Sequence, residues 1–397
     1  MSKHQTDVFE VTDGRADRAV IRVIGVGGGG CNTVNQMAQA GIDEVEFVCA
    51  NTDKQHLERC NTNTILQLGA EVTRGLGAGS DPSRGREAAE EDRDRIADLI
   101  EGTDMLFLTA GMGGGTGTGA APVIAEIARE MGILTVAVVT KPFSFEGKKR
   151  EKAAMNGIEE LEKHVDSLIL IPNQKLLVVL GEDADAEACF RAANDVLQNA
   201  VQGISDLITR PGLINVDFAD VKTVMQNRGK AMMGMGRSSG PERAMTAVEQ
   251  ALSSPLLDDI ELANAKGLLI NIACDKSLKM SEIRKINERV QQIAHEDVDA
   301  KFGTSLDLAL EGELRVSVVA TGLGAAQQMA HHAPMDQKVV QIQAAQAKQQ
   351  PKSWQQIASQ PAIERTQQAK GQPADLKGLV YDEAIIDIPA FLRAQAD

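Results

Sequence analysis

Apolar residues follow two different rhythms in the first half of the chain, and the two rhythms alternate. Short apolar runs are typical of buried strands, while apolar residues spaced three and four apart are typical of helices. The predicted strands are 21–24, 46–50, 65–68, 105–108, 134–139 and 167–171. Strands alternating with helices predict an α/β domain with a parallel sheet, covered on both faces, whose ligand site lies at the carboxyl ends of the strands.

A long amphipathic pattern follows and predicts a central core helix at 186–211. Its apolar stripe, spaced at three and four, consists of Phe190, Ala193, Val196, Leu197, Ala200, Val201, Ile204, Leu207 and Ile208. A stripe of this width is expected to face the core, apart from its first turns. Pro211 and Gly212 end the helix.

A smaller α+β domain is predicted at 212–324. It contains predicted strands at 267–273 and 314–320, with an amphipathic helix between them. We expect Ser281 to cap that helix, because a serine side chain can accept a hydrogen bond from the first turn. No reactive constellation is visible in this domain apart from its first residues, so its predicted role is mechanical and interfacial.

The two ends of the chain have a different composition from the predicted domains. Residues 1–18 are polar, and residues 325–380 are rich in glutamine and proline, which predicts disorder for both. Trp354, the only tryptophan, falls in the second of these segments, where we assign it no role. Apolar residues return in 381–397, at Ile385, Ile386, Ile388, Phe391 and Leu392, so this segment is predicted to bind a partner.

A glycine loop at 110–122 links the predicted strand at 105–108 to a helical pattern. Glycines leave no Cβ between the main chain and a ligand, so successive N–H groups can face a phosphate, aided by the following helix N-terminus. The predicted phosphate-binding residues are Gly113, Gly114, Gly115, Thr116, Gly117, Thr118 and Gly119, with the threonines adding hydroxyl donors. A merely flexible turn would explain neither the strand before the loop nor the helix after it.

A second glycine cluster follows the first predicted strand. Gly25, Gly27 and Gly30 fit the dinucleotide-binding spacing, and Asp53 lies at the distance that this fingerprint requires. Taken alone, this loop favours an NAD-dependent oxidoreductase. Two phosphate loops in one domain favour a nucleoside triphosphate instead, and the absence of a following Gly-Lys-Ser/Thr excludes a Walker A site.

Charge and cysteine content narrow the choice of function. The formal charge of -15 over 397 residues argues against a general nucleic-acid binder. The five cysteines form no close pair in the sequence, and no apolar leader precedes the first strand, so we expect a reduced, cytoplasmic protein. No apolar run reaches membrane-spanning length, and the six scattered histidines predict no metal site.

Three motifs in the same order resemble the FtsZ family of bacterial tubulin-like cell-division GTPases. They are Gly-Gly-Gly-Thr-Gly-Thr-Gly at 113–119, Asn-Val-Asp-Phe-Ala-Asp at 215–220 and Asp-Ile-Pro-Ala-Phe-Leu-Arg at 387–393. The ordered resemblance covers about 19–324. It implies a tubulin-like fold in which a Rossmann-type GTP-binding domain, 19–185, is joined by the core helix 186–211 to the second domain, 212–324. It also implies a linker at 325–380 and a partner-binding peptide at 381–397.

The resemblance also implies a set of nucleotide contacts. The first glycine loop would hold phosphates through Gly28, Gly29, Gly30, Cys31 and Asn32, where Cys31 departs from the glycine or asparagine of relatives. Asn51, Asp53 and Ala78 would lie near the phosphates and Mg²⁺, which is expected to bind mainly phosphate and water oxygens rather than a protein cage. Glu146 and Arg150 match residues near the ribose and phosphates. Asn173, Phe190 and Asp195 match the base pocket, where Asp195 would select guanine over adenine.

Within one chain, no residue is evident that would activate a water molecule. The resemblance implies that Asp217 and Asp220, with Asn215, act on the GTP of a neighbouring subunit that is packed head to tail. The alternative interpretation makes Asp217 a turn residue and Asp220 the N-cap of a helix at 221–225.

We therefore predict a GTPase that polymerises with itself into the septal ring at midcell. The segment 381–397 would bind membrane-tethering and regulatory division proteins, without direct membrane insertion. Two alternatives remain open: an NAD-dependent oxidoreductase, and a structural filament that binds nucleotide without turnover.

Overall fold

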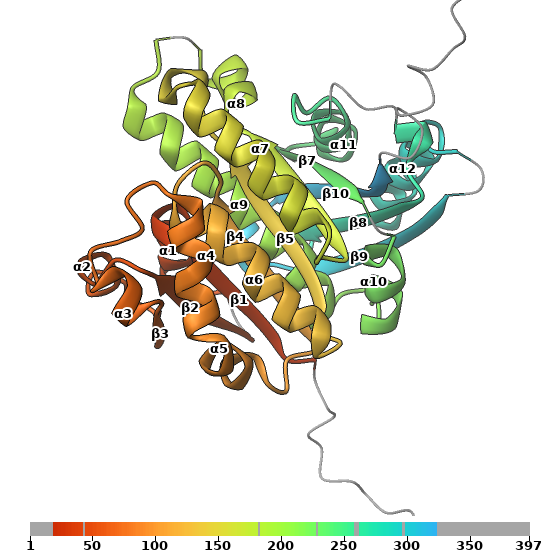
Figure 1. The fold of residues 1–397 in the computed structure, drawn as a ribbon. Helices are drawn as coiled ribbons and strands as arrows, with labels where there is room; N and C mark the ends of the chain where they lie inside the picture. Colours follow the sequence, from red (N-terminus) through yellow and green to blue (C-terminus); the bar gives the residue numbers. More distant parts are fainter. Residues whose placement is uncertain are drawn as a thin grey trace, which may run out of the picture. The chain divides into compact units, whose positions relative to one another are not determined.

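The computed structural model describes residues 19–42, 44–181, 183–227, 229–257, 262–295 and 298–323, drawn in Figure 1. All of them belong to one compact unit. The predicted disorder of 1–18 and 325–380, the partner peptide 381–397 and Trp354 lie outside the described residues.

A parallel sheet forms the first half of the described chain. Its strands are β1 (Ile21–Val26), β2 (Val45–Asn51), β3 (Thr64–Gln67), β4 (Met105–Gly111), β5 (Leu134–Lys141) and β6 (Ser167–Pro172), in the spatial order β3-β2-β1-β4-β5-β6. Every neighbouring pair is parallel. The six predicted strands and the parallel sheet are confirmed.

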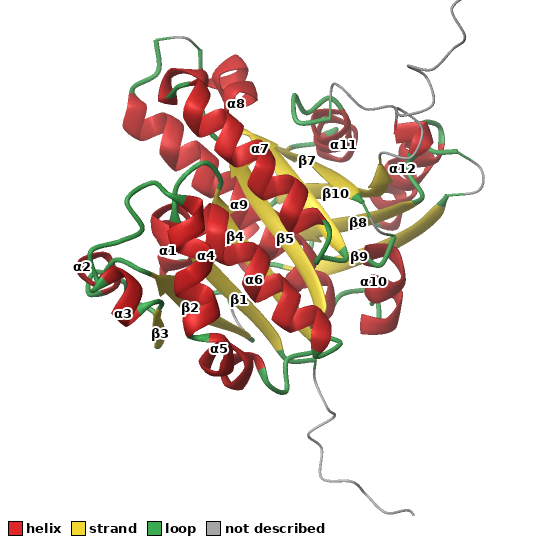
Figure 2. Ribbon diagram, in the orientation of Figure 1, coloured by secondary structure: helices red, strands yellow, loops and turns green. Residues whose placement is uncertain are grey.

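Helices cover both faces of this sheet because alternate strand residues point to opposite sides. On one face, Ile21 and Val23 pack with α1 (Gly27–Gln39) and α9 (Ala186–Thr209). On the other, Ile24 and Val26 pack with α4 (Pro82–Glu91), α5 (Arg93–Ile100), α6 (Thr116–Glu130) and α7 (Lys148–Glu162). Figure 2 shows α6 and α7 crossing in front of the strands. The shorter elements are α2 (Lys54–Leu57), α3 (Ala70–Thr73), η1 (Ser144–Glu146) and α8 (Asn173–Leu180).

The predicted long helix is confirmed as α9, which has 24 residues. The carboxylate of Asp185 caps its start by accepting a hydrogen bond from the Ala188 N–H at 2.7 Å. The helix ends at Thr209, two residues before Pro211, which cannot continue the hydrogen-bond pattern.

The second half of the chain adds four strands to the same sheet. They are β7 (Lys230–Ser239), β8 (Gly267–Cys274), β9 (Asp299–Leu306) and β10 (Glu313–Leu323). Strand β10 lies antiparallel between β7 and β8, and β9 is parallel to β8 at the edge. Strand β7 pairs with β6 through Leu168–Lys230 and Ile169–Ala231, so a single sheet of ten described strands joins the two halves.

The sequence pattern missed β7 and β9. Two glycines interrupt the apolar run of β7, and both let α11 (Arg243–Leu252) approach closely. A Cβ on Gly234 would lie 1.9 Å from the Ala251 carbonyl oxygen, and one on Gly236 would lie 2.0 Å from that of Ala247. Strand β9 is an edge strand with mixed polar and apolar residues, which weakens its periodicity.

Helix α12 (Met280–Gln291) is the predicted amphipathic helix, but its predicted cap is wrong. Its N-cap is Lys279, so Ser281 is the second residue of the helix. The Glu282 carboxylate accepts the Lys279 N–H at 2.8 Å and satisfies the helix start in place of a serine. Helices α11 and α12 cover the outer face of β8 and β10, and the short η2 (Leu262–Asn264) and η3 (Leu308–Leu310) complete this half.

A buried ion pair joins α11 to α12. Arg243 is 5% exposed, and its guanidinium makes two hydrogen bonds to the Glu282 carboxylate, at 2.7 and 3.0 Å. It also donates to the Ser277 hydroxyl at 2.9 Å and to the Gly312 carbonyl at 2.7 Å. Hydrogen bonding to Arg243 lowers the pKa of Glu282 and keeps it ionised. Removing either partner would leave a buried charge without compensation.

We predict that Arg243→Ala lowers the free energy of unfolding by about 3 to 5 kcal/mol. The matched control is Arg289→Ala, which breaks the more exposed Arg289–Glu249 pair between the same two helices and should cost no more than about 1 kcal/mol. Denaturant unfolding of both variants measures the two losses. Equal losses of unfolding free energy would show that burial does not make the Arg243–Glu282 pair more important for stability than the exposed pair.

Candidate functional site

The two glycine loops leave the sheet at the same level. Val26, at the end of β1, pairs with Ala50 of β2 on one side and Ala110 of β4 on the other. The loops are in direct contact, because a Cβ on Gly27 would lie 2.8 Å from the Gly117 nitrogen. Gly27 and Gly113 also have φ values of +72° and +102°, which side chains other than glycine rarely adopt.

Two helix N-termini open at this contact. Helix α1 begins at Gly27 and α6 begins at Thr116, so both direct main-chain N–H groups and positive dipole ends toward the same place. Of the first-loop residues, Gly28, Gly29 and Asn32 are exposed, while Gly30 and Cys31 are buried. In the second loop Gly114 is half-buried, and Gly113, Gly115, Thr116, Gly117, Thr118 and Gly119 are buried.

Some loop glycines are required for packing rather than for ligand access. A Cβ on Gly30 would lie 2.2 Å from the Thr109 carbonyl oxygen, and one on Gly119 would lie 2.0 Å from that of Pro82. These positions hold α1 close to β4 and α6 close to α4. The exposed Gly28 and Gly29 have no such clash below 3.3 Å and are the better placed to face a phosphate.

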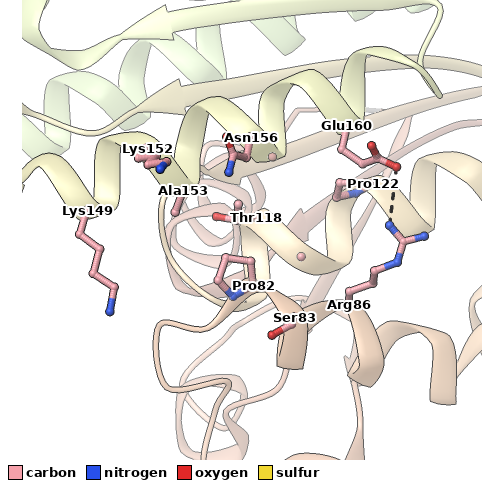
Figure 3. A pocket seen from close by; sticks show the side chains of 12 residues that line it. Pro82, Ser83, Arg86, Thr118, Pro122, Lys149, Lys152, Ala153, Asn156 and Glu160 are labelled. Carbon is pink, nitrogen blue, oxygen red and sulfur yellow. Dashed lines mark ion pairs between the residues drawn. The ribbon is translucent and has the colours of Figure 1, made fainter.

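The threonine hydroxyls of the second loop hold the loop in shape. Thr118 Oγ1 accepts the Gly113 N–H at 2.7 Å, and the Thr116 and Thr52 hydroxyls lie 2.6 Å apart. Since a hydroxyl both donates and accepts, Thr118 still has a proton to donate. Figure 3 shows Thr118 lining a groove of about 420 Å³ between α4, α6 and α7.

The segments after β2 and before α4 border the second loop. The Asn51 Oδ1 accepts the Asp53 N–H at 3.3 Å, and the Asp53 carboxylate caps α2 by accepting the His56 N–H at 3.2 Å. Ala78 faces the second loop, since a Cβ on Gly115 would lie 2.8 Å from the Ala78 Cβ. Arg150 also reaches this loop, because its Cγ would lie 2.7 Å from a Cβ on Gly113.

Arg150 forms an ion pair with Glu146 at 3.1 Å. The other carboxylate oxygen of Glu146 accepts the Phe143 N–H at 2.8 Å. Both oxygens of Glu146 therefore have partners within the chain, and a ribose hydroxyl would have to share them.

The predicted base-pocket residues come from α8 and α9. Asn173, at the start of α8, is 4% exposed, and its side-chain oxygen has no hydrogen-bond partner among the described residues. The Phe190 ring is 45% exposed and meets the edge of Phe143 with 5.4 Å between centroids. Asp195 Oδ1 accepts a hydrogen bond from the Gln36 amide at 2.5 Å. A buried acceptor left without a donor is costly, so the Asn173 oxygen fits a ligand that donates to it.

The segment after α9 contains the three predicted catalytic residues, Asn215, Asp217 and Asp220. Asp217 is the N-cap of α10 (Phe218–Met225), and its carboxylate accepts the Asp220 N–H at 2.7 Å. The alternative with Asp220 as the N-cap of a helix at 221–225 is therefore wrong. Asp220 instead pairs with the Lys301 ammonium at 2.9 Å, which raises the pKa of Lys301. Asn215 Oδ1 accepts the Gly212 N–H at 2.8 Å.

These acidic residues lie far from the glycine loops of their own chain. Asp195 is in the first half of α9, and the Asp217 segment follows the other end of that helix. From Asp195 to Thr209 the helix rises about 21 Å at 1.5 Å per residue. Figure 1 shows α8 and α10 at well-separated places. The two halves of the predicted active site are not brought together within one described chain.

Sequence reasoning missed a cluster of thiol and imidazole groups behind the first glycine loop. Ligand atoms of Cys31, His56 and Cys60 all lie within 4.8 Å of one another, and the Cys49 thiol donates to the Cys31 carbonyl oxygen at 3.8 Å. A hydrogen bond from Cys31, opposed by partial burial and aided by Cys49 and His56, lowers the pKa of Cys60 to about 6. The cysteines form no close pair in the sequence, and three of them come together only because β1 pairs with β2 in the fold.

Comparison with known proteins assigns both halves of the chain to one family. Residues 20–181 match the sequence model of the Tubulin/FtsZ family, GTPase domain, and residues 229–324 match that of the FtsZ family, C-terminal domain. The cell division protein FtsZ of Pseudomonas aeruginosa is 52% identical over 98% of this chain and 100% of its own length. That of Coxiella burnetii is 59% identical over 80% of this chain and 82% of its own.

Solved structures give the same answer. An FtsZ dimer from M. jannaschii superimposes with a TM-score of 0.76 and 45% identity, covering 78% of this chain and 90% of that one. CetZ2 from Haloferax volcanii, at 20% identity and a TM-score of 0.65, shares the fold.

The alternative of an NAD-dependent oxidoreductase is not supported, because the GTPase-domain match includes the first glycine loop. Among the described residues, no helix is long and apolar enough to cross a membrane. The chain belongs to the Tubulin/FtsZ family of GTPases and, within it, to the FtsZ proteins of cell division.

Proposed function

We propose that this chain binds GTP where its two glycine loops meet, and that it hydrolyses GTP only after a second copy has packed head to tail against it. The observation that carries the proposal is the separation of the glycine loops from Asp217 and Asp220 by much of the length of α9. A heterologous contact of this kind does not close on itself unless the rotation closes, so it yields filaments.

The phosphates would be held by main-chain N–H groups at the starts of α1 and α6, with Thr118 adding a hydroxyl donor. Mg²⁺, when bound, would neutralise charge on the phosphate oxygens and retain most of its waters. The neighbouring Asn51 and Asp53 would orient those waters. Arg150 would meet a phosphate, and the packing of its side chain on Gly113 supports this role.

Guanine would be selected at α8 and α9. The orphaned Asn173 oxygen offers one acceptor, and the Asp195 carboxylate offers another to the ring N–H and exocyclic amino group. Adenine lacks that pair of donors. The half-exposed ring of Phe190 would stack on the purine face.

The water that attacks the γ-phosphate would be oriented by Asp217 and Asp220 of the adjoining subunit. Asp217 fixes the first turn of α10, where the half-buried Asp220 side chain reaches Lys301. Lys301 pairs with the Asp220 carboxylate and holds it in position, and a carboxylate oriented in this way could accept a proton from water. Asn215 stabilises the turn that leads into this segment.

In the cell, we propose that the filaments form the cytoplasmic division ring at midcell. The segment 381–397 would attach them to membrane-tethering and regulatory division proteins. Many weakly bound tails along one filament would give a stable attachment through avidity.

Nucleotide preference tests the base pocket. We predict that Asp195→Ala weakens GTP binding about 10- to 150-fold, the value of a hydrogen bond to a charged group, and removes the preference for GTP over ATP. Gln36→Ala is the matched control, because it removes the Asp195–Gln36 contact while keeping the carboxylate. Competition against a fluorescent guanine nucleotide measures both. A similar loss in the two variants would mean that Asp195 only joins α1 to α9.

The shared active site is tested with Asp220→Ala. This variant should bind GTP normally and lose at least about 100-fold in hydrolysis, since positioned general bases contribute 10² to 10⁴. When it is mixed with the unchanged protein, turnover per active chain should fall, because some contacts then lack the carboxylate.

Asp299→Ala is the control for the Asp220 test. Asp299 also pairs with Lys301 and is as exposed as Asp220, at 42%. Phosphate release and light scattering, recorded together, report turnover and assembly. Turnover simply proportional to the unchanged protein would place the whole active site in one chain. Assembly without phosphate release from the unchanged protein would instead support a purely structural filament.

Deletion of 381–397 tests the division of labour between filament and tail. The truncated chain should assemble and hydrolyse GTP at the unchanged rate, because both site halves lie before residue 324. It should fail to bind vesicles that display a membrane-tethering division protein. Loss of assembly on truncation would make the tail part of the filament.

A further inference from the structure

Three thiols and one imidazole gather where α1 meets β2 and the segment that follows β2. Cys31 lies in α1, Cys49 lies in β2, and His56 and Cys60 lie in α2 and just after it. Cys31 and Cys49 are buried, whereas His56 and Cys60 are half-buried, so the cluster can be reached from one side. None of the proposed GTP chemistry needs the thiols or the imidazole.

The separations suit a tetrahedral metal ion. In such a site, metal–sulfur bonds of about 2.3 Å and metal–nitrogen bonds of about 2.0 Å place neighbouring ligand atoms roughly 3.5 to 3.8 Å apart. The ligand atoms of Cys31, His56 and Cys60 all lie within 4.8 Å of one another. Small side-chain movements of the half-buried His56 and Cys60 would close the remaining gap.

A fourth donor lies beside the first three. The buried Cys49 thiol donates to the Cys31 carbonyl oxygen at 3.8 Å, which places it next to Cys31. Three cysteines and one histidine form one of the ligand sets that close a structural zinc site. Buried cysteines that serve only as small apolar side chains need no imidazole within reach, so packing alone does not explain the cluster.

We propose that Cys31, His56 and Cys60, with Cys49 as fourth ligand, bind a borderline-soft tetrahedral cation of the Zn²⁺ type. Each coordinating thiol gives its proton to solvent and becomes a thiolate, and neutral His56 donates a ring nitrogen, so no electron transfer is involved. The site is distinct from that of the nucleotide's Mg²⁺, because Mg²⁺ takes oxygen ligands and does not select thiolates.

The ion would brace α2 against the first glycine loop. His56 already lies against this loop, since a Cβ on Gly28 would be 3.9 Å from the His56 Cε1. The main-chain N–H of His56 also donates to the carboxylate of Asp53, in the segment that follows β2. A bound ion would therefore cross-link α1, β2 and α2 directly behind the loop.

Cobalt(II) titration of the full chain tests the site, because a thiolate-bound tetrahedral cobalt ion gives charge-transfer and intense ligand-field absorption. In metal-free protein kept reduced without oxygen, we expect these bands to saturate at one cobalt per chain and to be removed by Zn²⁺. Cys60→Ser and His56→Ala should each weaken cobalt binding at least about 100-fold, since loss of even an outer-shell partner costs 10- to 100-fold.

Cys189→Ser and Cys274→Ser are the matched controls, because both residues are buried cysteines outside the cluster. They should leave the cobalt spectrum unchanged. Circular dichroism and the thermal midpoint confirm folding of each variant, and His56→Ala keeps the test decisive if Cys60→Ser does not fold. The proposal is overturned if the unchanged protein gives only the weak spectrum of oxygen-bound cobalt, or if folded Cys60→Ser and His56→Ala bind cobalt as tightly as the unchanged protein.

Discussion

In-register pairing of β1 with both β2 and β4 is the constraint on which the rest of the structure depends. Because Val26 pairs with Ala50 and Ala110, two glycine loops and the Asn51 segment start at one level of the sheet. The loops then approach so closely that Gly27 and Gly117 leave no room for a side chain. A slip of one residue in either pairing would reverse the faces of a strand buried on both sides. The register therefore fixes the phosphate site and the core together.

Helix α9 transmits that arrangement to the other half of the molecule. Near its start, Asn194 bonds to Thr33 at 3.0 Å and Asp195 bonds to Gln36, so the helix is fastened to α1 directly behind the first loop. Near its end, the buried Asp206 pairs with Arg210 at 3.1 Å and with Arg315 of β10 at 3.2 Å. One rigid element thus holds both the nucleotide side and the segment that bears Asp220.

The sequence predicts the helices and strands that have a regular apolar pattern. It does not predict contacts between residues that are distant in the chain. Strands β1 to β6, β8, β10 and helix α9 follow from apolar periodicity, because each buries a regular stripe or run. Strand β7 escapes because Gly234 and Gly236 replace apolar residues where α11 approaches. The caps at Ser281 and Asp220 are misplaced because a side chain several residues away can satisfy a helix start equally well.

Some parts of the candidate site could likewise be predicted from the sequence, and other parts could not. Glycine spacing identifies both loops from local sequence, since the chemistry of phosphate binding resides in consecutive N–H groups. The Cys31, Cys49, His56 and Cys60 cluster has no such local signature, because its members come from three elements that meet only once β1 and β2 have paired. Asp220 shows a further limit of reading one sequence. Because it lies far from the glycine loops of its own chain, its proposed role requires a second copy of the protein. The proposed site is shared between subunits, so one chain contains only two incomplete halves of it, and α9 is the element that keeps those halves apart.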